Sequence, residues 1–210
     1  MKTHIEEVKK LMPALKRAKG EFIVKYLGVS YDDFRKEVWV IREFVDGADL
    51  EALMKNPSLC PALRSPEKRI NLAVGICKGM AYLHNLRTPF LHGDFKPSDV
   101  LVPAKDLQPK ITNFGICDFK SFFVENAQRE DEYMEFLNAC QAPEVLVGGK
   151  RLLRNEIHEG QKIYFPDERP TLNSDIWALA AVIVQWLLET PPWDFQELCA
   201  RYKYRENKHV

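Results

Sequence analysis

A stretch near the middle of the chain, LHGDFKPSDVLV over residues 91–102, combines a charged head with an apolar tail. In its head, Asp94 and Lys96 are two residues apart, so a carboxylate and an ammonium group can face one reacting centre. The tail, Val100-Leu101-Val102, is typical of a short strand. An Asp-x-Lys triplet alone is most often a solvated surface pair, so its meaning depends on the segments around it.

The composition narrows the class of protein. The 210 residues include 30 Lys and Arg and 30 Asp and Glu, so no net charge favours nucleic acid or an anionic membrane as a partner. Hydrophobic residues make up 46% of the chain, which is enough for a globular core. The longest apolar run, residues 176–188, is shorter than the roughly 20 residues that a bilayer span needs. We expect a globular domain that recognises its partners at local sites, and neither nucleic acid nor membrane among them.

The cysteines and the amino terminus indicate a reducing compartment. Five cysteines, odd in number and widely spaced, form neither a CxxC pair nor a Cys/His cluster. The first ten residues, MKTHIEEVKK, are charged and helical in pattern, and they lack the apolar core of a signal peptide. Both observations predict a cytoplasmic protein.

The periodicity of apolar residues predicts the elements that precede the charged stretch. From Ile5 to Leu15 these residues return at three- and four-residue steps, which predicts an amphipathic helix that ends near Gly20. Two β-type runs follow at residues 22–27 and 38–41. Their proximity in sequence predicts that they pair as antiparallel strands.

The rest of the chain is predicted to be mainly helical. Residues 49–54 indicate a short helix, and Ser65-Pro66-Glu67 indicates the start of a long one, because proline is favoured at the first helical position. The runs 100–102 and 110–112 predict a hairpin of two short strands. A second long helix is predicted to begin at residues 173–175, and its apolar residues on almost every side predict burial.

These pieces, in this order, resemble the protein kinase family. The stretch from His92 resembles the family's catalytic loop, KITNFG at 110–115 its DFG turn, and QAPE at 141–144 its APE motif. SDIW at 174–177 and TPPW at 190–193 resemble the start of its helix F and the turn after that helix. Each motif is weak alone, but their order and spacing make chance a poor explanation. The resemblance covers nearly the whole chain, from the family's helix C to its helix G.

The resemblance implies an α+β fold of two lobes, truncated at both ends. Residues 1–45 would form a partial small lobe with helix C, two or more antiparallel strands and the start of the hinge. Residues 46–210 would form a mainly helical large lobe. The family's glycine-rich loop and its lysine have no counterpart in the chain. Within the large lobe the resemblance implies a catalytic loop at 92–99, an NFG turn at 113–115, an activation segment at 113–144, an insertion at about 149–170 and helix F at 174–189.

The resemblance also implies roles in phosphoryl transfer, with ATP and Mg²⁺ as cofactors, or no cofactor if the reaction has been lost. Asp94 falls on the base that accepts the substrate hydroxyl proton, and Lys96 on the lysine that steadies the transferred phosphate. Asp99 and Asn113 fall on the two metal ligands. The implied nucleotide contacts are Glu7, Glu43, Val45 and Leu101.

The metal ligands depart from the family pattern by an exchange. The family has Asn at the position of Asp99 and Asp at the position of Asn113. The exchanged pair still offers one carboxylate and one amide oxygen, so its summed charge towards Mg²⁺ is unchanged. The carboxylate has nonetheless moved to the other side of the site, so we expect weakened metal binding and slowed transfer.

Other departures point the same way. Gly93 replaces the arginine that grips a phosphorylated activation loop, and residues 136–140 lack the threonine that contacts the catalytic base in many serine/threonine kinases. Arg42 falls on the gatekeeper position behind the adenine pocket, where the family has an uncharged residue. A buried arginine there would need a carboxylate partner, for which Glu7 is a candidate, or access to solvent.

Three functions are compatible with these residues. The first is a pseudokinase that acts in signalling by binding a regulated protein partner, with little or no transfer. The second is an active ATP-dependent Ser/Thr or Tyr protein kinase that modifies a protein substrate and whose glycine-rich loop and lysine lie upstream of this chain. The third is a small-molecule kinase of the aminoglycoside or choline type, because the triplet at 92–94 also resembles the loop of those enzymes. Residues 95–97 and the APE motif fit protein kinases better, and the departures favour the pseudokinase.

Overall fold

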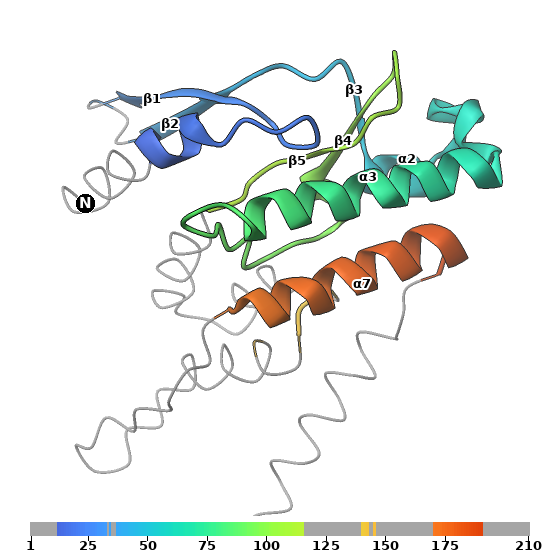
Figure 1. The fold of residues 1–210 in the computed structure, drawn as a ribbon. Coiled ribbons are helices and arrows are strands. Elements are labelled where there is room, and N and C mark those ends of the chain that lie inside the picture. The colour runs from blue at the N-terminus through green and yellow to red at the C-terminus, as the bar shows by residue number, and fades with distance from the viewer. Residues whose placement is uncertain are drawn as a thin grey trace, which may run out of the picture. The chain divides into compact units, whose positions relative to one another are not determined.

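The computed structural model describes residues 12–32, 34, 37–115, 140–142, 145 and 170–190 (Figure 1). These residues belong to two compact units. The first unit holds the described residues up to His92 and those from Pro97 to Gly115, and the second holds Gly93–Lys96 and the described residues from 140 onward. The charged stretch at 91–102 therefore contributes to both units.

The first unit contains a ribbon of two antiparallel strands, β1 (Tyr26–Asp32) and β2 (Glu37–Arg42). The predicted pairing is confirmed, but the predicted first strand, 22–27, is wrong in its bounds. Ile23 instead bridges Ile111 in parallel, with a hydrogen bond of 2.9 Å from the Ile111 N–H to the Phe22 carbonyl. Tertiary pairing therefore divides one β-type run between two partners, which propensity alone does not reveal.

A three-stranded antiparallel sheet, in the order β3–β4–β5, carries the second half of the charged stretch. The predicted hairpin is confirmed, with Val100 paired to Ile111 and Leu101 to Lys110. Val100 and Val102 are buried and alternate with half-buried neighbours, as expected for a strand with one face on a core. The strands are β3 (Gly47–Asp49), β4 (Val100–Pro103) and β5 (Lys110–Ile111).

The helices of the first unit follow the sequence signals closely. Asp49 caps the short helix, since its carboxylate accepts from the backbone N–H of Ala52 at 2.8 Å. The long helix begins at Pro66 as predicted. Residues 12–17 are helical, and residues 5–11 of the predicted first helix lie outside the described part of the chain. The elements are α2 (Leu50–Lys55), α3 (Pro66–His84) and the 3-10 turns η1 (Pro57–Leu59), η2 (Pro61–Arg64) and η3 (Pro97–Asp99).

The second unit contains α7 (Leu172–Leu188), which begins one residue before the predicted range. Thr171 and Ser174 close its amino terminus by reciprocal hydrogen bonds of 2.7 and 3.2 Å between backbone N–H groups and side-chain oxygens. The predicted burial on almost every side is wrong, because apolarity does not say which neighbours cover a side chain. Buried side chains include Ala178, Ala181, Val182 and Trp186, and exposed ones include Ile176, Trp177, Val184, Leu187 and Leu188.

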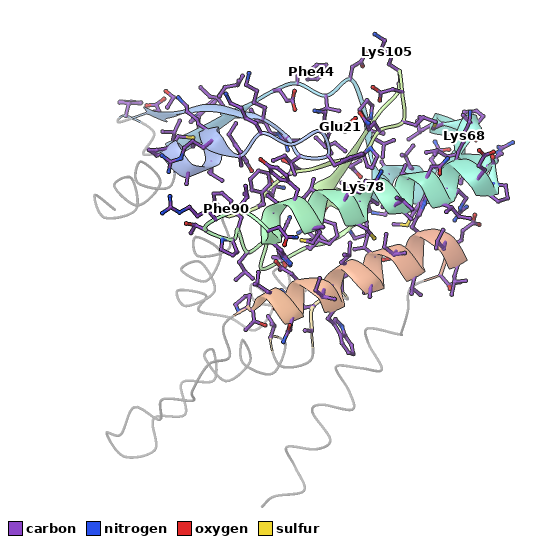
Figure 2. The ribbon with its side chains drawn as sticks, in the orientation of Figure 1. Glu21, Phe44, Lys68, Lys78, Phe90 and Lys105 are labelled. Carbon is purple, nitrogen blue, oxygen red and sulfur yellow. The ribbon has the colours of Figure 1, made fainter. Side chains whose placement is uncertain are left out.

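Two glycines on α3 allow the chain to pack closely against this helix. A Cβ on Gly79 would lie 2.7 Å from the backbone oxygen of Phe22, and one on Gly75 would lie 2.6 Å from Cγ of Pro109. Lys78, labelled in Figure 2, places its Nζ 5.5 Å from the centre of the Phe22 ring. Figure 1 shows α3 alongside β5, the strand that leads directly to Asn113.

Gly79→Ala should lower the free energy of unfolding by about 1–3 kcal/mol. Alanine is favoured over glycine in a helix by about 1 kcal/mol. Its Cβ would nevertheless meet the Phe22 oxygen, which cannot move without breaking its hydrogen bond to Ile111. Chemical denaturation measures the difference. Gly28→Ala is the control, because nothing lies within 4 Å of a Cβ there. Equal free energies of unfolding for the two variants would contradict the packing argument.

Candidate active site

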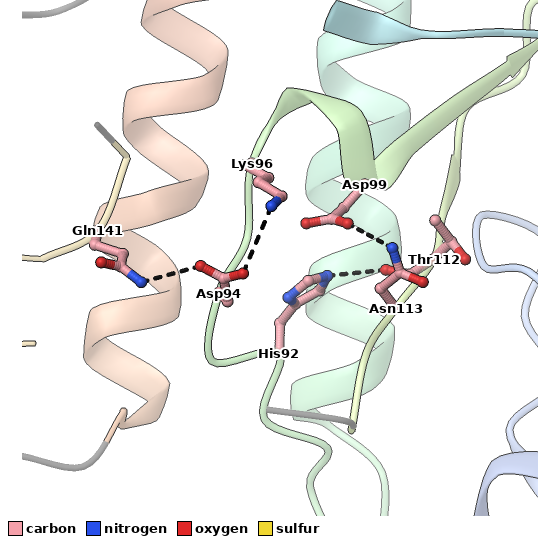
Figure 3. Close-up of polar contacts among 7 residues, drawn as sticks. All are labelled: His92, Asp94, Lys96, Asp99, Thr112, Asn113 and Gln141. Atoms are coloured by element: carbon pink, nitrogen blue, oxygen red, sulfur yellow. Dashed lines mark hydrogen bonds and ion pairs between the residues drawn. The ribbon is translucent and has the colours of Figure 1, made fainter. Parts of the chain in front are cut away.

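The two predicted metal ligands lie in the first unit and contact each other. Asp99 precedes β4 and Asn113 follows β5 closely, so the hairpin brings them together. Asn113 Nδ2 donates a hydrogen bond of 2.7 Å to Asp99 Oδ1 (Figure 3). Asp99 is only 1% exposed, so little water competes for this bond. Asn113 has a φ of 60°, in the left-handed region that Asn tolerates better than most residues.

As oriented here, the pair is closed by its own hydrogen bond and does not present two oxygens to a divalent metal ion. Mg²⁺ needs oxygen ligands at about 2.1 Å, whereas Asn113 presents its N–H₂ group to the Asp99 carboxylate. Among the described residues, no group of three or more His, Cys, Asp or Glu could hold a metal ion. The exchanged side chains are therefore joined by one hydrogen bond, between Asn113 Nδ2 and Asp99 Oδ1.

The NFG turn is packed into the first unit. The buried Phe114 ring lies between Tyr26 and Phe90, with centroid separations of 5.1 and 5.8 Å and edge-on geometry. Gly115 has a φ of 70°, and its N–H donates to the Leu91 carbonyl at 3.2 Å. Burial raises the pKa of Tyr26, which favours its neutral form beside the ring. The turn is thus held by aromatic contacts.

Thr112, the residue before Asn113, is bonded at three of its groups. Its backbone N–H donates to the Asp99 carbonyl at 2.9 Å, and its own carbonyl accepts from Nε2 of the buried His92 at 2.9 Å (Figure 3). Its hydroxyl accepts from Nη1 of Arg42. Arg42 is also exposed, so it reaches solvent, which is one of the two outcomes expected for it. The other candidate partner, Glu7, lies outside the described residues.

The predicted nucleotide contacts Glu43, Val45 and Leu101 all lie in the first unit, and all three are half-buried. The Glu43 carboxylate accepts from Lys110 Nζ at 2.9 Å and from the backbone N–H of Lys25 at 3.0 Å. Burial alone would raise the pKa of Glu43. The two hydrogen bonds act in the opposite direction and outweigh burial, so the pKa of Glu43 lies below its ordinary value. Glu43 thus ties the chain after β2 to β5.

The predicted catalytic pair lies in the second unit. Lys96 Nζ is 3.8 Å from Asp94 Oδ2, and the Asp94 side chain is 8% exposed. The backbone N–H of Gly93 donates to Asp175 Oδ1 on α7 at 2.8 Å, which holds the loop. Gly93 has a φ of 78°, in the region that glycine adopts without strain. The backbone conformation therefore also explains why glycine occupies this position, besides the loss of the arginine charge.

Gln141 is a further residue of this cluster, and sequence reasoning missed it. Its Nε2 donates to Asp94 Oδ1 at 3.0 Å (Figure 3). Its neighbours Cys140 and Ala142 are both buried. The available signal was a polar residue directly before the alanine of QAPE, beside a segment without the expected threonine.

Comparison with known proteins identifies the family. The sequence model of the protein kinase domain matches residues 2–208, almost the whole chain. This chain belongs to the protein kinase family. The predicted α+β fold of helices and antiparallel strands is thereby confirmed as a protein kinase domain.

Relatives of this kinase domain include plant and yeast kinases. A receptor-like serine/threonine-protein kinase of Arabidopsis thaliana is 33% identical over 49% of the chain and 16% of its own length. The serine/threonine-protein kinase VIK of the same plant is 27% identical over 90% of the chain and 36% of its own length. The MAP kinase kinase skh1/pek1 of Schizosaccharomyces pombe is 24% identical over 82% and 40%. The chain thus spans less than half the length of these relatives. None of the described helices is long and apolar enough to cross a membrane.

The Glu43 contacts of the kinase domain predict an acid-dependent stability. Because the pKa of Glu43 in the folded state is below its ordinary value of 4.5, its stabilising contribution is present above that pH. The contribution is lost as the pH falls through the lowered folded-state pKa. Glu43→Gln and Lys110→Met should therefore both flatten the acid limb of a plot of melting temperature against pH. Glu51→Gln on α2 is the control variant, because it neutralises a glutamate in the same way as Glu43→Gln. An acid limb unchanged by Glu43→Gln would contradict this assignment.

Proposed function

We propose that this protein kinase domain is a pseudokinase, with little or no phosphotransfer of its own, that acts in signalling by binding a protein partner. The observation that carries the proposal is the hydrogen bond from Asn113 to Asp99. Both side chains fall on the family's metal-ligand positions, and each is engaged by the other. The proposed location of the protein is the cytoplasm.

The energy of this bond supports weak metal binding. A metal ion at the pair would have to break a buried hydrogen bond to a carboxylate, worth about 1.5–3 kcal/mol. A loss of this size corresponds to roughly tenfold to hundredfold weaker binding. Mg²⁺ would supply the charge that neutralises the transferred phosphate, so weaker metal binding means slower transfer.

Arg42 and Gly93 support the same proposal. Arg42 falls on the family's gatekeeper position, and its guanidinium donates a hydrogen bond to the Thr112 hydroxyl. A charged side chain at this position would narrow the adenine pocket. Gly93 offers no cation to a phosphorylated activation segment. The proposed nucleotide contacts remain Glu43, Val45 and Leu101. The proposed lobes of the domain are residues 1–45 and 46–210.

An active serine/threonine kinase is the second candidate. Asp94 and Lys96 keep the residue types that the family uses for the base and for the phosphate-steadying lysine. The Asp94 carboxylate is largely buried and hydrogen-bonded, which favours a defined orientation. On this alternative the domain would use ATP and Mg²⁺ and would modify a protein substrate, and Asp99 with Asn113 would still have to bind the metal.

Restoring the family order of the metal pair should restore metal binding. The unsubstituted chain should show almost no change in melting temperature with millimolar Mg²⁺. The double variant Asp99→Asn with Asn113→Asp should be stabilised, by about 2.7 kcal/mol when Mg²⁺ reaches 100 times its dissociation constant. The exchange conserves composition and net charge, so each variant is a matched control for the other. Equal stabilisation of both proteins would contradict the proposal.

Phosphotransfer separates the two candidates. The purified chain with radiolabelled Mg-ATP should label neither itself nor a generic protein substrate. Transfer that is abolished by Asp94→Ala, and kept by Asp46→Ala at an exposed position, would instead favour the active kinase.

A further inference from the structure

We propose that Gln141 is the positioning residue that holds the Asp94 carboxylate, and that it does so without any phosphate. The inference rests on the proposed function only in naming Asp94 as the residue at the family's base position. The contacts that carry it all lie within the second unit.

The two carboxylate oxygens of Asp94 have different partners. Oδ1 accepts from Gln141 Nε2 at 3.0 Å, whereas Lys96 Nζ lies 3.8 Å from Oδ2 (Figure 3). A donor on one oxygen and a cation near the other fix the rotation of the carboxylate about its Cβ–Cγ bond. The site of the Gln141 bond is partly buried, so water competes little for the donor.

Gln141 can perform this role because its own backbone is fixed. Its neighbours Cys140 and Ala142 are 2% and 1% exposed, and the Ala142 carbonyl accepts from the Val145 N–H at 3.0 Å. Cys140 Sγ lies 3.9 Å from Oε1 of Gln185 on α7. A long, flexible side chain becomes a precise donor only when the main chain on both sides of it is anchored.

The same helix anchors both partners of the Gln141–Asp94 bond. Asp175, in the first turn of α7, holds the backbone N–H of Gly93 next to Asp94. Gln185, ten residues further along α7, contacts Cys140 next to Gln141. α7 therefore sets the separation of the loop and the segment that the bond spans.

The donor that Gln141 contributes to this tether is a neutral amide. Gly93 stands where the family uses an arginine to hold a phosphorylated segment, and here a neutral amide on residue 141 reaches the loop instead. An amide that donates to a carboxylate needs no added phosphate. The tether therefore forms without a phosphate group on either partner.

Carbon NMR of the full chain with labelled aspartate carboxyls tests the inference. The Asp94 signal is assigned from its loss in Asp94→Asn. Gln141→Leu should shift that signal, because it removes the donor while it keeps an apolar stem of similar size. Gln108→Leu is the matched control, since the Gln108 amide donates to Glu21 at 2.6 Å in the first unit. That control should leave the Asp94 signal unchanged.

The reciprocal measurement follows the amide hydrogens of Gln141. Asp94→Asn should speed their exchange with solvent about tenfold, the loss expected for a hydrogen bond to a charged group. Exchange at Gln108 should not change. Phosphatase treatment of the unsubstituted chain should affect neither the Asp94 signal nor the exchange rate.

Each failure has a distinct meaning. An Asp94 signal that stays in place in folded Gln141→Leu would overturn the inference. If that variant does not fold, unchanged Gln141 exchange in Asp94→Asn would overturn it equally. An effect of phosphatase would overturn the claim of independence from phosphate. None of these results depends on Mg²⁺ binding or phosphotransfer, so the proposed function stands or falls separately.

Discussion

The backbone pairing of Ile111 is the constraint on which the candidate site depends. Its N–H donates to Phe22 and its carbonyl accepts from Val24, while β4 pairs with it on the other side at Val100. Ile111 thus uses both of its backbone groups on one edge, and on the other edge the N–H of Thr112 donates to the Asp99 carbonyl. A strand paired along both edges cannot shift its register without losing several buried hydrogen bonds. The two residues that follow, Thr112 and Asn113, therefore leave the sheet at a fixed point.

Thr112, the first residue after this strand, forms a polar junction with three other segments of the chain. Its hydroxyl, carbonyl and N–H groups bond to residues from three separate segments, namely Arg42, His92 and Asp99. Each of these contacts satisfies a polar group that would otherwise be costly to bury. The junction leaves Asn113 little freedom, which explains how its short side chain can meet the Asp99 carboxylate reliably.

The parts predictable from sequence were those set by local chemistry. The helix start at Pro66 and the hairpin of β4 and β5 follow from capping and from alternation of apolar residues. The bounds of β1, the partial burial of α7 and the Gln141–Asp94 bond depend on partners distant in the sequence. The motifs placed residue types at the candidate site, but they carried no information on which side chains would bond to each other.

The exchange of Asp99 and Asn113 keeps the summed charge of the pair but changes which side chain can donate a hydrogen bond to the other. A carboxylate can only accept hydrogen bonds, whereas an amide both donates and accepts. Asp99 is nearly inaccessible to water and needs donors, and Asn113, at its left-handed backbone position, supplies one. The carboxyl group thus belongs to the buried member of the pair, where a neutral amide donates a hydrogen bond to it. A metal ion at this pair would have to displace the Asn113 donor from Asp99 Oδ1, a cost that the family order of the two residue types does not impose.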